Sequence, residues 1–232
     1  MLTLVMLPGM DGTGDLFAPL IARFGSAVQC IVVRYPDEPL GYEELIAHAR
    51  RALPASGDFF LLGESFSGPV AIALAAEQPH RLRGLILSAT FVRNPLSWTS
   101  PLVPLVRVLP VTGAAASLMT ELILGSFSTP GLRATISASL AQMSPPTIRA
   151  RLRAIAAVDA SLNLAAVSVP ILYLCAEQDL VVPQSACSLI ERLKPATKVV
   201  SFNAPHFLLQ VAIDEGACAL QKFMSDNIPA SA

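Results

Sequence analysis

Short, continuous apolar runs, separated by helix-like segments, are the feature of this sequence that most restricts its fold. The runs lack the polar alternation of a half-exposed strand, so they favour strands that are buried on both faces of a parallel sheet. Strands are predicted at Leu2–Leu7, Val28–Val33, Phe59–Leu62, Gly84–Ala89, Val169–Leu174 and Lys198–Phe202. Their alternation with helices requires right-handed crossovers and predicts an α/β fold with a doubly wound, mostly parallel sheet.

Helices are predicted between these strands, above and below the sheet. Apolar residues recur at i, i+4 and i+8 within Asp15–Phe24 and Tyr42–Leu53, and Ser65–Gln78 is rich in Ala, Leu and Ile. Two further helices are predicted after the last two strands, at Pro183–Leu193 and Pro205–Met224.

The alternation stops between Phe91 and about Ala165, where no run is strand-like. Apolar helical faces are predicted there from Leu118, Met119, Leu122 and Ile123, from Leu132, Ile136 and Leu140, and from Ile148, Leu152 and Ile155. We therefore expect residues 1–90 and 166–232 to form one α/β core and residues 91–165 to form a helical lid. The apolar faces are expected to line an acyl pocket, with packing against one another as the alternative.

The composition excludes several classes of protein. Apolar residues make up 53% of the chain, but its most apolar stretch, Pro101–Gly125, contains Arg107, Glu121 and three prolines, so no membrane span is expected. With 16 Lys and Arg against 17 Asp and Glu, the chain lacks the basic excess that non-specific nucleic-acid binding needs. The N-terminus has no basic region before Pro8-Gly9, so no secretory signal is expected.

The cysteines and histidines argue against disulfides and metal sites. The four cysteines have no C-x-x-C spacing and are expected to be reduced, mostly buried thiols, which favours the cytoplasm. None of the three histidines lies in H-x-x-H or H-E-x-x-H spacing, so no zinc or di-iron site is expected.

The strongest local signal is the hexapeptide Gly63-Glu64-Ser65-Phe66-Ser67-Gly68. It follows a predicted buried strand and begins an alanine-rich helix, with Pro69 in the first turn, where its missing N–H does no harm. A serine in such a sharp turn needs small neighbours at −2 and +2, and Gly63 and Ser67 are small. The turn would expose the Ser65 hydroxyl as a nucleophile at the carboxyl edge of the sheet. The alternative is that Ser65 only caps the helix.

A serine nucleophile needs a general base, and the base itself needs an acid to orient it. His48 lies within a predicted helix and His80 in a turn at the opposite edge of the sheet, whereas His206 directly follows the last predicted strand. Elimination therefore favours His206 as the base.

The acid is expected after an intermediate strand. Asp179 lies in the short turn that follows the predicted strand Val169–Leu174. Glu177 falls early in that turn and is expected to face solvent, and Asp159, near the end of the inserted helices, is expected to be a cap or a surface charge. The resulting order Ser65, Asp179, His206 is that of the Ser-Asp-His triad in the α/β-hydrolase fold.

The glycine-rich loop Leu7–Gly14 after the first strand is expected to supply backbone N–H groups to a reacting carbonyl oxygen. A phosphate-binding loop is the alternative, but the glycines are not in G-x-G-x-x-G order, the P-loop lysine is absent, and Asp15 would repel phosphate. No cofactor is therefore expected. The predicted oxyanion hole consists of the N–H groups of Met10 and Phe66.

From Leu2 to the final helix the chain resembles the α/β-hydrolase superfamily, in the Gly63–Gly68 turn, Asp179 and His206. It departs from the superfamily at Pro8-Gly9, where His-Gly is usual, and at Ser67, where glycine is usual. The first predicted strand is also expected to match the third strand of the superfamily, without the usual N-terminal hairpin before it. Leu7–Gly14 together with the serine turn looks like small bacterial hydrolases, and the Pro-Gly-x-Asp-Gly-Thr-Gly phrase is similar to one in plant phytyl ester synthases. The short helical lid resembles that of pimeloyl-carrier-protein methyl ester esterases.

These residues and the resemblance predict a carboxylic ester hydrolase that cleaves small-molecule esters of apolar acyl groups. Acyl transfer to an alcohol by the same serine and a non-catalytic, ligand-binding role are the alternatives. Arg149, Arg151 and Arg153, in the last predicted lid helix, are expected to form a solvated face. A sharper hypothesis is that Arg149 and Arg153 dock an acidic acyl carrier protein.

Overall fold

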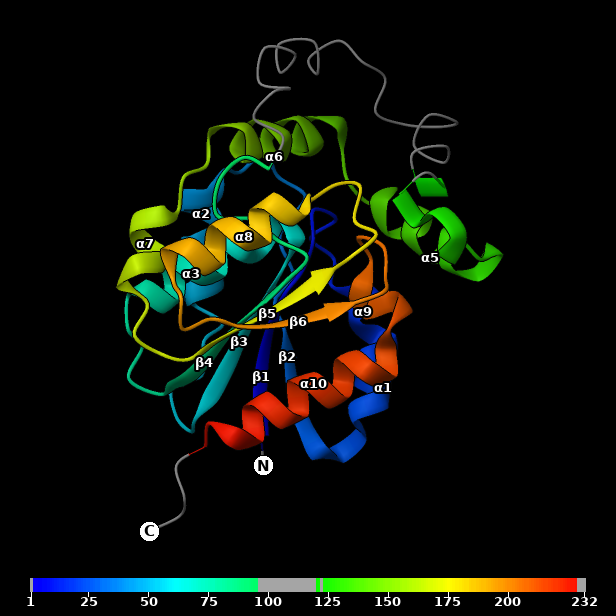
Figure 1. Ribbon diagram of the computed structural model, residues 1–232. Helices are drawn as coiled ribbons and strands as arrows, with labels where there is room; N and C mark the ends of the chain where they lie inside the picture. Colours follow the sequence, from blue (N-terminus) through cyan, green and yellow to red (C-terminus); the bar gives the residue numbers. More distant parts are fainter. Residues whose placement is uncertain (1, 96–119, 122, 229–232) are drawn as a thin grey trace.

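The computed structural model describes residues 2–95, 120–121 and 123–228, whose strands form one sheet between two layers of helices (Figure 1). The strands pair in the order β2-β1-β3-β4-β5-β6, and every pair is parallel. Their bounds are β1 Leu2–Leu7, β2 Val28–Val32, β3 Phe59–Glu64, β4 Leu82–Ser88, β5 Ile171–Ala176 and β6 Lys198–Phe202. The chain runs outward from β1 to β2 and then returns past β1 to build β3–β6, so the predicted doubly wound parallel sheet is confirmed.

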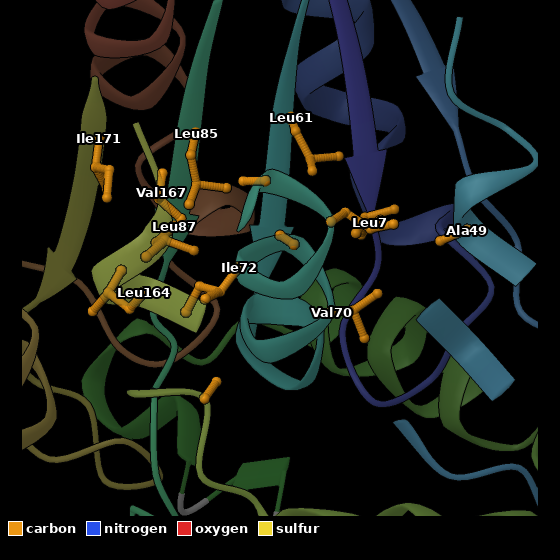
Figure 2. Close-up of a cluster of buried hydrophobic side chains, with 14 of the residues drawn as sticks. Leu7, Ala49, Leu61, Val70, Ile72, Leu85, Leu87, Leu164, Val167 and Ile171 are labelled. Atoms are coloured by element: carbon orange, nitrogen blue, oxygen red, sulfur yellow. The ribbon is translucent and has the colours of Figure 1, made fainter. Parts of the chain in front are cut away.

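Side chains of the central strands alternate between the two helical layers, as the uninterrupted apolar runs predict. In β1, Val5 and Leu7 pack on one face of the sheet, and Leu4 and Met6 pack on the other. The first face is covered by α2 (Tyr42–Arg50), α3 (Gly68–Ala76), α7 (Ser161–Ala166) and α8 (Gln184–Leu193). Part of this core is drawn in Figure 2, where side chains of the sheet meet those of α3 and α7.

The opposite face of the sheet is covered by a smaller set of helices. These are α1 (Ala18–Phe24), which follows the short 3-10 turn η1 (Asp15–Phe17), with α9 (Leu208–Val211) and α10 (Ile213–Asp226). Phe60 of β3 packs edge-on against Phe223 of α10, with ring centroids 6.1 Å apart. Burying one side chain of this size stabilises the folded state by about 1.5–3 kcal/mol. Contacts of this kind on both faces hold the sheet, and with it the site residues at the ends of its strands, in place.

Helices without strands follow β4, as the sequence predicts. In the described residues these are η5 (Gly125–Phe127), α5 (Pro130–Leu140), α6 (Pro145–Ala157) and α7. The predicted face of Leu132, Ile136 and Leu140 packs against Leu16 and Phe207 of the core. A second predicted face falls mainly on Leu118, Met119 and Leu122, which lie outside the described residues. Of the third face, Ile148 is buried, Leu152 is half-buried and Ile155 packs against the core.

The helix predicted at Pro205–Met224 is wrong in its first turns. The chain stays non-helical to Phe207 and then forms α9 and α10 as two separate helices. The Ala204 carbonyl accepts the N–H of Gln178 at 3.0 Å, which ties this segment to the turn after β5. A loop rather than a helix therefore carries His206 at the carboxyl end of β6.

All four cysteines lie in the described part of the chain and are unpaired thiols; Cys175 and Cys187 are buried, and Cys218 is exposed. Within the described residues, no helix combines the length and the apolar character that crossing a bilayer requires.

Candidate active site

Ser65 lies at the sharp turn where β3 passes into the 3-10 turn η3 (Ser65–Ser67) and then α3. Its φ of 48° is in the left-handed region, which costs a residue with a Cβ atom about 1–3 kcal/mol. Close packing holds the turn: a Cβ atom on Gly63 would lie 2.7 Å from Ala71 Cβ, and one on Gly68 would lie 1.9 Å from Thr90 Oγ1. The strained backbone therefore projects the Ser65 side chain from the carboxyl edge of the sheet.

Ser65, His206 and Asp179 lie in one chain of hydrogen bonds. Ser65 Oγ is 2.8 Å from His206 Nε2, and His206 Nδ1 is 2.8 Å from Asp179 Oδ2. The other carboxylate oxygen of Asp179 accepts the N–H groups of Val181 and Val182 at 2.7 and 2.8 Å. Since Nδ1 faces a carboxylate, we assign the imidazole proton to it, which leaves Nε2 to accept the Ser65 hydroxyl proton.

This arrangement has the connectivity that a serine nucleophile requires. The side chains of His206 and Asp179 are only 10% and 3% exposed, so little water competes for their hydrogen bond. The three residues come from the ends of β3, β5 and β6, which share one edge of the sheet.

The alternatives considered from the sequence lie elsewhere. His48 is on α2, with Nε2 2.8 Å from the Arg34 carbonyl oxygen, and His80 is exposed in the turn before β4. Glu177 is exposed. Asp159 pairs with Arg93 at 3.0 Å on the surface.

The loop after β1 turns beside Ser65. The Gly12 N–H donates to the Gly9 carbonyl at 3.1 Å, and Gly12 has a φ of 73°, which favours glycine. Met10, one of the two predicted oxyanion donors, lies inside this turn. Phe66, the other, lies in the first turn of η3, where backbone N–H groups have no partner within the helix.

Ser67 joins this loop to the turn that carries Ser65. Its hydroxyl donates to the Pro8 carbonyl and therefore accepts from the Tyr35 hydroxyl, whose oxygen is 2.7 Å away. Ser67 is fully buried. Serine at this position is thus more than a tolerated replacement for glycine, because its hydroxyl bridges two segments of the site.

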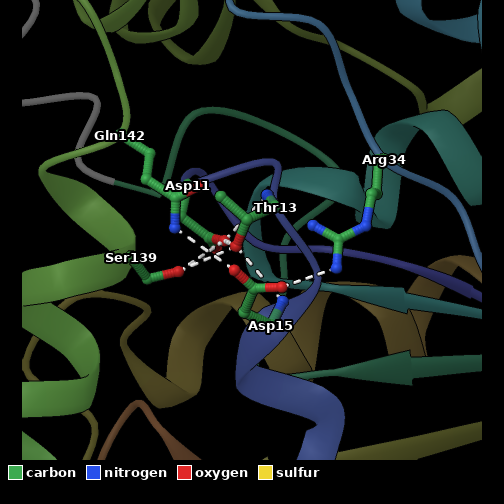
Figure 3. Close-up of polar contacts among 6 residues, drawn as sticks. All are labelled: Asp11, Thr13, Asp15, Arg34, Ser139 and Gln142. Carbon is green, nitrogen blue, oxygen red and sulfur yellow. Dashed lines mark hydrogen bonds and ion pairs between the residues drawn. The ribbon is translucent and has the colours of Figure 1, made fainter.

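A network of polar side chains connects the same loop to α5 (Figure 3). Asp11 Oδ2 accepts the Thr13 N–H at 2.9 Å and the Ser139 hydroxyl at 3.1 Å. Asp15, predicted to repel phosphate, forms an ion pair with Arg34 at 2.6 Å.

Glu64, directly before Ser65, is a buried acid that the sequence analysis gave no role. Gln210 Nε2 donates to Glu64 Oε1 at 3.1 Å. Burial raises the pKa of Glu64 to about 7, against the lowering effect of the Gln210 hydrogen bond, and nearby Asp11 raises it further. An acid at the end of a strand predicted to be buried on both faces is the signal that could have identified it.

Arg151 corrects the expectation that Arg149, Arg151 and Arg153 form a solvated face. Arg153 is exposed and Arg149 is half-buried, but Arg151 is 1% exposed. Its Nη1 donates to the Met10 carbonyl at 2.5 Å. The prediction failed because one side of α6 lies against the core. Arg151 is on that side, whereas Arg153 is on the side that faces solvent.

No group of three or more His, Cys, Asp or Glu side chains among the described residues is arranged to hold a metal ion. The polar side chains at the sheet edge instead form hydrogen bonds with one another and with the backbone.

The single parallel sheet, its flanking helices and the strained serine turn define an α/β-hydrolase. A family model described as serine aminopeptidase, S33 (Hydrolase_4), matches residues 41–206, and the chain belongs to this family.

Relatives and solved structures agree with this assignment. The chain is 35% identical over 118 residues to phytyl ester synthase 1 of Arabidopsis thaliana, a match that spans 47% of this chain and 16% of that protein. A bromoperoxidase from Bacillus anthracis has a TM-score of 0.84 at 16% identity, covering 97% of this chain and 92% of that one. A thermophilic esterase from Thermogutta terrifontis has a TM-score of 0.83 at 20% identity, covering 97% and 90%. At these identities the structures establish the fold.

Proposed function

We propose that the protein is a serine esterase in which Ser65 is the nucleophile, His206 the general base and acid, and Asp179 the residue that orients His206. The observation that carries this proposal is the pair of 2.8 Å contacts from Ser65 Oγ to His206 Nε2 and from His206 Nδ1 to Asp179 Oδ2. The stability of the fold does not require these three side chains to lie in contact, so their arrangement supports a catalytic role.

In this mechanism His206 takes the Ser65 proton as Oγ attacks the ester carbonyl carbon. The N–H groups of Met10 and Phe66 would hold the oxyanion of the tetrahedral intermediate. The His206 imidazolium, stabilised by Asp179, then gives its proton to the leaving alcohol as the acyl-enzyme forms. Water attacks the acyl-enzyme in the same way and releases the acid.

We also propose that residues 91–165 form a lid over this site and that the substrate carries an apolar acyl group. The apolar face of α5 supports this, because Leu132, Ile136 and Leu140 pack with Leu16 and with Phe207, the residue after His206. The substrate is then a small-molecule ester whose acyl chain lies against the partly exposed members of this cluster, Leu132, Leu140 and Phe207.

The experiment is a panel of p-nitrophenyl esters graded by acyl length, assayed with wild type and Ser65→Ala. Loss of Ser65 is expected to lower kcat by about 10⁴-fold or more while the folded state is retained, since triad members act as a unit. Because the family is described as serine aminopeptidase, aminoacyl p-nitroanilides belong in the same panel. Wild-type rates in Ser65→Ala would reject the nucleophile, and a flat chain-length profile would reject the apolar acyl site.

Acyl transfer to an alcohol is a second candidate, favoured by the 35% identity to a phytyl ester synthase. It uses the same acyl-enzyme, with an alcohol in place of water. Product analysis with a long-chain alcohol added to the assay separates the two: a new ester indicates transfer, and free acid alone indicates hydrolysis.

Docking of an acidic acyl carrier protein and a cytoplasmic location stay predictions from the sequence. Of the two arginines invoked for docking, Arg153 is exposed and Arg149 is half-buried, so the basic face of α6 is smaller than expected. Salt-sensitive binding of an acyl carrier protein that is lost in the Arg149→Ala, Arg153→Ala double variant would support the docking.

A further inference from the structure

Arg151 reaches from α6 into the loop that would hold the substrate oxyanion. Its side chain is 1% exposed, so its position is set by protein atoms rather than by water. Nη1 donates to the Met10 carbonyl at 2.5 Å, and Nη2 donates to the Pro36 carbonyl at 3.2 Å. The planar guanidinium therefore joins the loop after β1 to the segment after β2.

The same guanidinium contacts the second proposed oxyanion donor. Its Cζ lies 5.9 Å from the ring centroid of Phe66 and 5.8 Å from that of Tyr35, within cation–π range. Tyr35 in turn donates to Ser67 in the turn that carries Ser65. One side chain thus touches both residues whose N–H groups are proposed to form the oxyanion hole.

The loop is shaped to receive this group. A Cβ atom on Gly12 would lie 2.6 Å from Arg151 Nη1, and Gly12 has a φ of 73°, so glycine meets both a steric and a backbone requirement. Arg151 Nη1 also donates to the thioether sulfur Sδ of Met143 at 3.5 Å. Burial lowers the pKa of Arg151, while the charges of Asp11 and Asp37 favour its protonated form.

A second inserted helix bonds to the same loop. From α5, Ser139 donates to Asp11 at 3.1 Å, and Gln142, just beyond the helix, donates to Asp15 at 3.2 Å (Figure 3). The segment between β4 and β5 thus braces the loop at several points, of which the Arg151 contact lies nearest to Met10.

We propose that Arg151 is a positioning residue for catalysis, which holds the backbone of Met10 and Phe66 so that their N–H groups converge on the substrate oxyanion. The proposal rests on the proposed function, because it presumes that Ser65 forms a tetrahedral intermediate. Oxyanion donors act only when they are already in place, and a displacement of about 1 Å can cost about 100-fold in rate.

The test compares Arg151→Met, which removes the donors but keeps an unbranched side chain, with Arg151→Lys, which keeps the charge. Arg192→Met is the matched control, since Arg192 is exposed on α8 and has no proposed part in the site. For each variant, kcat and KM are measured on a p-nitrophenyl ester, and Ki is measured for an alkyl trifluoromethyl ketone. Ser65 Oγ adds to the ketone carbon and places the resulting oxyanion in the hole. Thermal unfolding gives the Tm.

We expect Arg151→Met to lower kcat by about 10–100-fold, with KM changed less than about twofold, and to raise Ki by the same factor as kcat falls. Arg151→Lys should fall between Arg151→Met and wild type, and Arg192→Met should match wild type. If Arg151→Met does not fold, the folded Arg151→Lys variant carries the comparison. A folded variant with a lowered Tm but wild-type kcat and Ki would overturn the proposal and leave Arg151 with a structural role alone.

Labelling of wild type by a fluorophosphonate separates this outcome from failure of the proposed function. An unlabelled Ser65 would reject the esterase itself. A labelled Ser65 together with unchanged kcat in the Arg151 variants would reject only the positioning role.

Discussion

Replacing the buried acid Glu64 by glutamine should stabilise the protein at alkaline pH and not at acid pH. Glu64 has a pKa raised from the ordinary value of 4.5 to about 7 because burial penalises its charged form. The amide of Glu64→Gln is nearly isosteric and keeps an oxygen to accept from Gln210. The variant therefore removes the titration while leaving the packing and this hydrogen bond in place.

The size of the effect follows from the two pKa values. A carboxyl whose pKa is higher in the folded state contributes its full stability below the unfolded value of 4.5 and loses it as the pH rises through about 7. One pKa unit is worth about 1.4 kcal/mol, so the complete loss is about 3 kcal/mol. Of this, about 2 kcal/mol is lost between about pH 5.5 and about pH 8.5.

The assay is urea unfolding followed by far-UV circular dichroism at these two pH values. The stability of Glu64→Gln relative to wild type should rise by about 2 kcal/mol from the lower to the higher pH. Glu43→Gln is the matched control, because Glu43 is exposed on α2 and the same substitution there removes no buried carboxyl. A stability difference for Glu64→Gln that does not change with pH would refute the reasoning.

Two further substitutions test the catalytic chain and the packing of the serine turn. Asp179→Asn should lower kcat by about 10⁴-fold with little change in Tm, because it removes the carboxylate that orients His206; a loss below about tenfold would contradict the assignment. Gly68→Ala should cost about 1–3 kcal/mol in urea unfolding, because its Cβ would overlap Thr90. Gly131→Ala, where nothing lies within 4 Å, should cost nothing, and equal losses at both glycines would contradict the packing argument.

The sheet and the relative order of the site residues were predictable because each depends on local sequence signals. Leu2–Leu7 and Lys198–Phe202 form strands with the predicted bounds. For Leu2–Leu7 the reason is that a continuous apolar run, of which the last four residues are buried, predicts a strand without knowledge of its partners. Ser65 was predicted as the nucleophile from the small residues that its sharp turn requires, and His206 was predicted as the base by elimination and by its place after a strand. The structure brings their side chains within hydrogen-bond distance.

The buried charged groups were not predictable because their partners are distant in the sequence. Arg151 contacts Met10, which is 141 residues away, and Glu64 contacts Gln210, which is 146 residues away. Arginines on a helix are predicted to be exposed to solvent, and only the folded structure shows which of them packs against another segment. The non-helical start of the segment predicted as a helix from Pro205 had the same cause, because the Ala204 carbonyl accepts the Gln178 N–H from another loop.

The nucleophilic role of Ser65 is tested most directly by identifying the residue that a fluorophosphonate modifies. Peptide mass spectrometry of labelled wild type should find the adduct on Ser65. The His206→Ala variant, which lacks the general base, should be labelled at least about 100-fold more slowly. Wild type that retains ester hydrolysis without an adduct on Ser65, or labelling at the same rate in His206→Ala, would contradict the account.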